Sequence, residues 1–496
     1  MAKKSVIIFA VVVLAVIGAS IGYFVTRKAT DASSASGTNG TSSSNSTSKG
    51  SSSTSGGKTS TSDIGFTSGS SGDVSATVSK ITSDPTAQTY KLSAFAIGDW
   101  GATTYSKNGS CCTRRKDFAY NSFDRHAEAG VAMLMGMAAD KLKPKVVLGH
   151  GDNFYWSGIM DATDQAYRFD ATFESKYTAT SLMDVPWVNV MGNHDYGGGS
   201  YICYDGTDMA ACGSTTELMA ALKAKFTLQS GYKSPNNDRW KLTDHFYVHS
   251  IKDGDVSIDI FNLDTNDAES HGADQICCQC YGYSGGDDDK LCKTITRGHK
   301  YCAGGDTGMY DTCMKQFNDW GDEAKTKLAA AVKKSTATWK IVNTHYSPYA
   351  HYGETSAAKW VKALQGIEGL QLWINGHTHG EKHDFANFNM HFIENGAGGG
   401  IQSESASGIP TSASGWISNV WTAGGLTDGT LDGNTYGFFE IAGSKEWLKV
   451  RFLTFDSNWQ LTTKDDGLKN GKIGGVAAKH CWYIPIDGTK GKQCTE

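Results

Sequence analysis

Short apolar segments of strand length recur from about residue 92 to residue 455, and glycine or polar residues follow them. They alternate with segments of helix length at residues 121–142 and 313–334. Strands that alternate with helices in this way predict an α/β fold. The expected strands are residues 92–97, 145–148, 187–191, 257–263, 339–343 and 370–374, with further strands at 390–393, 437–441 and 447–455.

Short motifs rich in Asp, Asn and His follow five of these strands. They read Ile97-Gly98-Asp99-Trp100, Gly151-Asp152-Asn153-Phe154-Tyr155, Gly192-Asn193-His194-Asp195, Asn343-Thr344-His345-Tyr346 and Gly376-His377-Thr378-His379. Loops at the carboxyl ends of the strands converge in α/β sheets, so we expect these side chains along one edge. Carboxylates and imidazoles bind hard or borderline cations, and a carboxylate can bridge two ions. The motifs together predict a two-metal site.

Each motif alone also has a structural interpretation. Asp99 could cap a helix, and residues 192–195 could form a simple turn. His377 and His379 could be ordinary histidines at the end of a strand. The occurrence of all five motifs in one chain, each at a strand end, favours a site over these alternatives.

The five motifs resemble those of the calcineurin-like metallophosphoesterases, over about residues 92–455. Tyr155, three residues after Asp152, resembles the purple acid phosphatases, which include the tartrate-resistant acid phosphatases. The resemblance implies an α/β four-layer sandwich of two mixed sheets flanked by helices, in a single catalytic domain. A packed aromatic side chain is the alternative interpretation of Tyr155.

The resemblance also implies a binuclear metal centre with a bridging carboxylate from Asp152. One set of ligands would hold Fe(III), and the other would hold Fe(II), Zn(II) or Mn(II). The first set is Asp99, Asp152, Tyr155 and His379, and the second is Asp152, Asn193, His345 and His377.

The implied reaction is that of an acid phosphatase, in which a metal-bound hydroxide attacks the phosphorus of a phosphate monoester in line. His194 would contact the phosphoryl group, and a histidine would help the leaving group depart. His351 is the match to the second substrate-site histidine of the family, although its spacing from His345 is shorter than in the small animal-type enzymes. A surface histidine is the alternative interpretation of His351.

Two other functions remain open from the sequence. One is a zinc- or manganese-dependent phosphodiesterase or nucleotidase of the same superfamily, and the other is a non-enzymatic cell-surface or wall protein with a relic metal site. A formal net charge of -5 gives no broad basic field, which argues against nucleic acid as a partner. The expected substrates are phosphorylated small molecules or phosphoproteins, and we expect the catalytic domain to be monomeric.

The chain begins with a segment that predicts export. Residues 6–25 are almost wholly apolar and follow Lys3 and Lys4, as in a type II signal-anchor. A cleaved signal peptide is the alternative, because Gly18-Ala19-Ser20 supplies small residues near a cleavage point. In both cases the chain after about residue 28 lies outside the cytosol, secreted or at the cell surface.

Residues 29–80 are dominated by Ser, Thr and Gly, which predicts a disordered stalk, and residues 81–496 form the expected catalytic domain. Glycosylation sequons occur at Asn39, Asn45 and Asn108. The sequence contains 12 cysteines, an even number that predicts disulfides in an exported protein. Half of them fall in an insertion at about residues 267–313, where a zinc cluster of Cys277, Cys278 and Cys280 is the alternative.

Overall fold

The structure is a computed structural model that describes residues 79–101, 122–286, 289–423, 436–464 and 466–494. The predicted membrane segment, the stalk, the three sequons, Cys111 and Cys112 lie outside these ranges. Within the described ranges, no helix has both the length and the apolar character needed to cross a bilayer.

The described residues belong to one compact unit, and two large sheets form its centre. In spatial order, the eight-stranded sheet contains β17 (Lys492–Gln493), β16 (Val476–Pro485), β15 (Trp447–Phe455), β14 (Gly437–Gly443), β1 (Leu92–Ile97), β2 (Val147–Gly149), β3 (Trp187–Asn189) and β6 (Trp240–Lys241). The seven-stranded sheet contains β13 (Ile417–Thr422), β11 (Glu381–Ala386), β12 (Met390–Asn395), β10 (Leu372–Asn375), β9 (Trp339–Asn343), β8 (Val256–Leu263) and β7 (Phe246–Asp253). A small pair joins β4 (Cys203–Tyr204) to β5 (Met209–Ala210).

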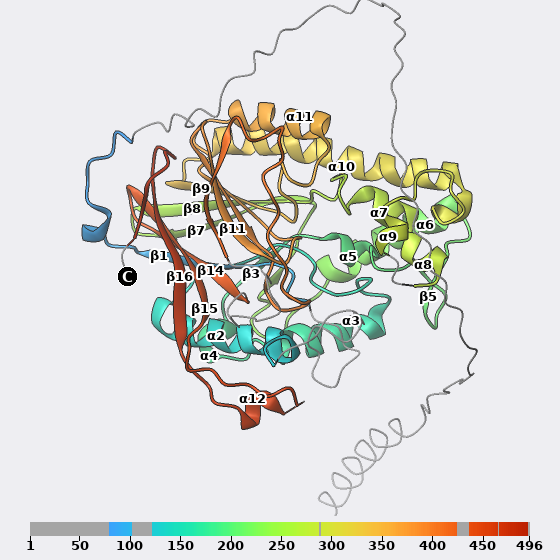
Figure 1. The fold of residues 1–496 in the computed structure, drawn as a ribbon, viewed down its shortest axis with the longest axis horizontal. Coiled ribbons are helices and arrows are strands. Elements are labelled where there is room, and N and C mark those ends of the chain that lie inside the picture. Colours follow the sequence, from blue (N-terminus) through green and yellow to red (C-terminus); the bar gives the residue numbers. More distant parts are fainter. Residues whose placement is uncertain (1–78, 102–121, 287–288, 424–435, 465, 495–496) are drawn as a thin grey trace, which may run out of the picture. The chain divides into compact units, whose positions relative to one another are not determined.

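The helices lie outside the sheets. They are α2 (Ala127–Leu142), α3 (Ala162–Phe169), α4 (Thr180–Met183), α5 (Asn193–Tyr196), α6 (Thr215–Ser230), α7 (Ala273–Cys278), α8 (Cys280–Ser284), α9 (Asp289–Cys292), α10 (Thr307–Lys334), α11 (Glu354–Gln365) and α12 (Gly467–Asn470). Helix α2 packs against β14, β15 and β16, while α10 and α11 pack together beside the seven-stranded sheet (Figure 1). The order of layers is therefore helix, sheet, sheet and helix, which confirms the predicted four-layer α/β architecture with two mixed sheets.

The core between the two sheets explains why the central strands are so apolar. It is built from aliphatic side chains of both sheets, including Leu92, Ile258, Ile341 and Val450. Every residue of β1 is buried, as expected for a strand that is covered on both faces. Burial of such side chains stabilises the fold by roughly 25 cal/mol for each Å² of apolar surface removed from water.

The parallel strands bring the predicted motifs to one edge. Strands β1, β2 and β3 run parallel in one sheet, and β8, β9 and β10 run parallel in the other. The predicted bounds of β1, β9 and β15 agree with the structure. Helix α10 begins at Thr307, earlier than predicted, because the Asp306 carboxylate caps it by accepting a hydrogen bond from the Met309 N–H at 2.9 Å.

The cysteine-rich insertion is held by three disulfides, Cys277–Cys313, Cys278–Cys302 and Cys280–Cys292. Two more disulfides, Cys203–Cys212 and Cys481–Cys494, complete the pairing of the described cysteines. The disulfide prediction is confirmed for these residues. The zinc alternative is wrong, because its three cysteines are each bonded to another cysteine.

Candidate metal centre

Both sheets contribute side chains to the candidate site. Asp99, Asp152 and Asn193 follow the parallel strands β1, β2 and β3 of the eight-stranded sheet. His345 follows β9, and His377 follows β10, in the seven-stranded sheet. The site therefore forms only when the two sheets pack face to face with the carboxyl ends of these strands at the same edge.

Four of the predicted ligands have a left-handed backbone conformation, in which non-glycine residues are uncommon. Their φ angles are 54° for Asp99, 51° for Asp152, 79° for His377 and 44° for His379. Such conformations carry a cost of about 1–3 kcal/mol each and cluster at functional sites. These outliers agree with a functional role for the strand ends.

The glycines of the motifs leave room for the carboxylates. A Cβ atom at Gly192 would lie 2.2 Å from Oδ1 of Asp152, and one at Gly376 would lie 2.2 Å from Oδ2 of Asp99. Both positions therefore require glycine as long as the carboxylates keep their places.

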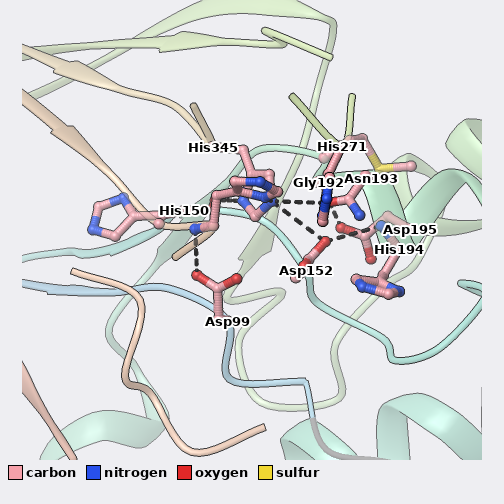
Figure 2. A network of polar contacts seen from close by, with 12 residues as sticks. Asp99, His150, Asp152, Gly192, Asn193, His194, Asp195, His271 and His345 are labelled. Carbon is pink, nitrogen blue, oxygen red and sulfur yellow. Dashed lines mark hydrogen bonds and ion pairs between the residues drawn. The ribbon is translucent and has the colours of Figure 1, made fainter. Parts of the chain in front are cut away.

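Asp152, Asn193, His345 and His377 meet on one side of the site. Nε2 of His345 lies 3.1 Å from Oδ1 of Asn193 and 3.6 Å from Oδ1 of Asp152. Nδ1 of His377 lies 3.3 Å from the same Nε2 atom. Figure 2 shows Asp152 among His345, Asn193 and His194.

The hydrogen bonds fix the tautomer of His345. Its Nδ1 lies 2.7 Å from the His150 carbonyl oxygen, which can only accept, so Nδ1 carries the proton. Nε2 then presents a lone pair to the oxygens of Asp152 and Asn193. Such a backbone hydrogen bond on the far nitrogen is the usual way to orient a metal-binding imidazole.

Tyr155, Asp99 and His379 meet on the other side. The Tyr155 hydroxyl donates to Oδ1 of Asp99 at 3.1 Å and lies 3.3 Å from Nε2 of His379. Nδ1 of His379 lies 3.3 Å from a carboxylate oxygen of Glu404, and it therefore carries the proton. As with His345, the Nε2 lone pair faces the site. Tyr155 is fully buried within the site, so it is more than an aromatic side chain packed behind it.

Burial and neighbouring charges shift the pKa values of the acidic groups in the site. Burial and the adjacent Asp152 raise the pKa of Asp99 well above its usual range. Burial also acts to raise the pKa of Asp152, but His345 and His194 outweigh it and bring that pKa below its usual value. Burial and the two carboxylates raise the pKa of the Tyr155 phenol. A bound cation would act in the opposite direction on the phenol and on Asp99, by favouring their charged forms.

The donor set fits metal ions. Ligand atoms of Asp99, Asp152 and His345 all lie within 4.8 Å of one another. Oδ2 of Asp152 is buried and has no hydrogen-bond partner among the described residues. Lone pairs of imidazole, carboxylate and amide groups thus point at one another with few protons between them. A cation is the group that satisfies such an arrangement.

The structure brings both predicted substrate-site histidines to this edge. Nδ1 of His194 donates to the Trp156 carbonyl oxygen at 2.8 Å, and the ring lies 4.6 Å from that of Tyr155. His351 is 3% exposed, and its ring lies 4.7 Å from that of His377. The interpretation of His351 as a surface histidine is therefore wrong.

His351 presents a proton without a partner. Its Nδ1 accepts a hydrogen bond from the Ser347 N–H at 2.9 Å, so Nε2 is the protonated nitrogen of the neutral ring. This Nε2 is buried and has no partner among the described residues. Burial lowers the pKa of His351 to about 3, with the nearby His345 as a second cause.

Three residues of the site have no assigned role in the sequence prediction. The Asp195 carboxylate accepts hydrogen bonds from the backbone N–H groups of Gly192, Asn153 and Phe154 at 2.8–3.1 Å and so joins two of the motif loops. Glu404 contacts His379, as described above, and the His271 ring lies 6.1 Å from that of His377. Only Asp195 had a sequence signal, its place in a motif; Glu404 and His271 lie in irregular segments far along the chain from their partners.

Comparisons with known proteins agree with this geometry. Residues 94–381 match the model of the calcineurin-like phosphoesterase family. Purple acid phosphatase 3 of Arabidopsis thaliana is 26% identical over 311 residues, which are 62% of this chain and 63% of that protein. The match thus spans less than two thirds of that relative. The human tartrate-resistant acid phosphatase type 5 is 25% identical over 308 residues, which are 61% of this chain and 71% of that protein.

Among solved structures, one match is described as GAP50, the anchor in the inner membrane complex of Plasmodium. The identity is 16% and the TM-score is 0.43, over 78% of this chain and 90% of that chain. The family match covers more than half of the chain and includes all five motifs in full. The chain therefore belongs to the calcineurin-like phosphoesterase family, with purple acid phosphatases and tartrate-resistant acid phosphatases among its relatives.

Proposed function

We propose that this chain is an acid phosphatase that hydrolyses phosphate monoesters at a binuclear centre of Fe(III) with Fe(II), Zn(II) or Mn(II). The observation that supports this most is the convergence of lone pairs from both sheets around Asp152, with the Tyr155 phenol on one side. A phenolate is a hard, strongly donating ligand and suits a trivalent ion. The residues that would hold Fe(III) are Asp99, Asp152, Tyr155 and His379. Those that would hold the divalent ion are Asp152, Asn193, His345 and His377.

Two bound cations would supply positive charge for the phosphate oxygens and lower the pKa of water, so that a nucleophile is available at low pH. The remaining work falls to side chains of this chain. The ring of His194 is held by the Trp156 carbonyl, and its second nitrogen, for which the described residues offer no hydrogen-bond partner, can contact a phosphate oxygen. The buried Nε2–H of His351 is oriented by Ser347 and can donate to the ester or leaving-group oxygen.

Phosphate release from an aryl phosphomonoester and from a matching diester, between acid and neutral pH, tests this function. The full-length chain and an Asp152→Ala variant would be compared. We expect monoester turnover at acid pH that disappears in the variant. Dominant diester turnover would instead indicate a phosphodiesterase or nucleotidase with zinc or manganese. The absence of any metal-dependent turnover would refute the enzyme proposal and favour a non-enzymatic surface protein.

We also propose that the catalytic domain lies outside the cytosol. The five disulfides of the described residues are typical of exported proteins. Amino-terminal sequencing of the protein recovered from membrane and medium fractions would distinguish an anchor from a cleaved signal peptide. A reduced protein confined to the cytosol would contradict export.

A further inference from the structure

The loop of residues 155–159, a short distance after Asp152, serves both halves of the candidate site. Its first residue, Tyr155, contributes the phenol that contacts Asp99 at 3.1 Å. The next residue, Trp156, contributes the carbonyl oxygen that orients His194 at 2.8 Å. A shift of residues 155–159 would therefore move a proposed metal ligand and a proposed substrate contact together.

Arg168, on α3, holds this loop from one side. Its guanidinium donates from Nη2 to the Tyr155 carbonyl oxygen at 2.5 Å and from Nη1 to the Gly158 carbonyl oxygen at 3.4 Å. The side chain is only 6% exposed, and the guanidinium carbon lies 5.5 Å from the centre of the Phe154 ring. The planar fork of arginine is well suited to fixing two carbonyls at once.

Lys225, on α6, contacts two other carbonyl groups of the same loop. Its Nζ donates to the Ser157 carbonyl oxygen at 2.6 Å and lies 3.5 Å from the Ile159 carbonyl oxygen. The side chain is 3% exposed. Two buried cations from two helices thus contact four of the five carbonyls of residues 155–159.

Burial of two basic side chains is costly, and it lowers the pKa of Lys225 to about 7. Burial of an ion costs several kcal/mol, and carbonyl dipoles offset that cost only when the geometry is good. Asp164 is the carboxylate whose charge acts on both cations, and its Oδ2 accepts from the Met160 N–H at 2.9 Å at the end of the same loop. A loop that needed only packing could be supported by apolar side chains, so the cations indicate a demand for precise position.

We propose that Arg168 and Lys225 are positioning residues, which set the Tyr155 phenol and the His194 ring in register with the metal centre. We call this pair the carbonyl clamp. It rests on the proposed function for its purpose, but its effect on residues 155–159 can be measured without turnover. Neither side chain contacts a predicted metal ligand other than through the backbone oxygen of Tyr155.

The clamp is tested with Arg168→Met and Lys225→Met, which remove the charge and keep an unbranched stem. Lys223→Met is the matched control, because Lys223 lies on the same helix α6 and is exposed. Three quantities are measured on the full-length chain. They are amide hydrogen exchange of residues 155–159, the phenolate absorption that develops when Fe(III) is added, and kcat and KM for an aryl phosphomonoester.

We expect faster exchange at residues 155–159 and a shifted or weakened phenolate band in both clamp variants, with no change in the control. We also expect kcat to fall about 10- to 100-fold while KM changes little, because small misplacement of reacting groups is costly. Unchanged exchange and an unchanged band in folded variants would overturn the proposal.

Should either variant fail to fold, Arg168→Gln and Lys225→Gln provide the same comparison, because the shorter neutral side chain cannot reach both carbonyl groups that the wild-type residue contacts. Faster exchange in these milder variants supports the clamp, and wild-type exchange in them overturns it. A wild-type protein that shows no turnover would refute the proposed function alone, because the exchange of residues 155–159 would still decide the clamp.

Discussion

Two groups of three histidines differ in their hydrogen bonds. The metal-centre histidines are His345, His377 and His379. The histidine chain consists of His383 on β11, His391 on β12 and His480 on β16, and it connects the two sheets. In both groups every imidazole ring has at least one nitrogen within 3.3 Å of another polar atom.

Hydrogen bonds within the histidine chain, and one to a backbone carbonyl, pair its imidazole N–H donors. Nε2 of His391 lies 3.0 Å from the Thr489 carbonyl oxygen and must donate to it. Nδ1 of His391 then accepts from Nε2–H of His383 at 2.8 Å, and Nδ1 of His383 accepts from Nε2–H of His480 at 2.9 Å. One neutral tautomer at each ring therefore pairs every donor in the chain with an acceptor.

The metal-centre histidines do not pair their donors and acceptors with one another in this way. Nδ1–H of His345 and Nδ1–H of His379 point outward to a carbonyl and a carboxylate, so both Nε2 lone pairs face carboxylate, amide or hydroxyl oxygens. The comparison shows that a cluster of histidines does not by itself indicate a metal. A cluster in which acceptors face acceptors favours a bound cation, because a cation offsets their repulsion.

The largest expected effect comes from the same substitution made in each group. His345→Leu removes a proposed ligand and should lower phosphomonoester turnover by more than about 100-fold, since loss of an outer-shell partner alone costs about 10- to 100-fold. His383→Leu, the matched control, should retain turnover within a few-fold. Steady-state kinetics on both folded variants measures this, and equal losses in the two would remove the distinction between the groups.

Metal removal should change the properties that depend on the metal-centre histidines and not those that depend on the histidine chain. Dialysis against a chelator should abolish turnover and lower the unfolding temperature of the wild type, because a ligand at 100 times its dissociation constant stabilises the fold by about 2.7 kcal/mol. His383→Leu should show the same loss, and His345→Leu a smaller one. Calorimetric scans with and without added Fe(II) or Zn(II) check this. A wild-type unfolding temperature that is the same with and without the chelator would argue against bound metal.

The histidine chain should matter for stability. His383→Leu leaves a buried acceptor on His391 and a buried donor on His480, and each unpaired group costs about 1–3 kcal/mol. We therefore expect the free energy of unfolding to fall by about 2–6 kcal/mol, with metal content unchanged. Urea denaturation of the metal-free protein measures the loss, while a reduced metal content in the folded variant would contradict the separation of roles.

Acid should weaken the histidine chain. Burial lowers the pKa of His391 to about 4 and that of His480 to about 4. Because an unfolded histidine has a pKa of about 6.5, the unfolded state binds more protons between these values, and stability falls as the pH falls through that window. Each histidine should account for about 2 kcal/mol between pH 7 and pH 5.

A His480→Gln variant tests this dependence. Gln cannot take up the proton, so its free energy of unfolding should fall less steeply with acid than that of the wild type. Denaturation at pH 7, 6 and 5 provides the comparison. Parallel curves for the two proteins would show that His480 does not bind an extra proton on unfolding in this range.

The smallest effect is expected at Glu404. Its carboxylate holds the Nδ1 proton of His379 at 3.3 Å, and Glu404→Gln keeps a hydrogen-bond acceptor there while removing the charge. We expect about a 10-fold loss of metal affinity or turnover, at the low end for such partners. Competition with a chromogenic chelator measures the affinity. A loss as large as that of His345→Leu would place Glu404 among the metal ligands themselves.

The sequence predicted the strand ends well and the irregular regions poorly. Strands β1, β9 and β15 are predominantly apolar and were predicted with correct bounds. Strand β11 was not predicted, because its sequence Glu-Lys-His-Asp-Phe-Ala is polar although every residue is buried. These polar groups form contacts with distant segments, such as that of His383 with His480, and no local pattern reveals them.

The candidate site was likewise predicted from the sequence only in part. The seven predicted ligands lie together because parallel strands bring their carboxyl ends to one edge. Glu404, Arg168 and Lys225 were not predicted, because none of them lies in a motif and no local pattern reveals their partners. Lys225 is 66 or more residues from the carbonyl groups that it contacts. The disulfide pairing was likewise not predictable, since many pairings are compatible with the same cysteine positions.

The most direct test of the account is the number of metal ions bound by the purified full-length chain. Inductively coupled plasma mass spectrometry on wild type, His345→Leu and His383→Leu would give this number. We predict about two ions per chain in wild type and in His383→Leu, at least one of them iron, and a clear loss in His345→Leu. Wild-type protein that binds less than one ion after incubation with iron and zinc would contradict the binuclear centre.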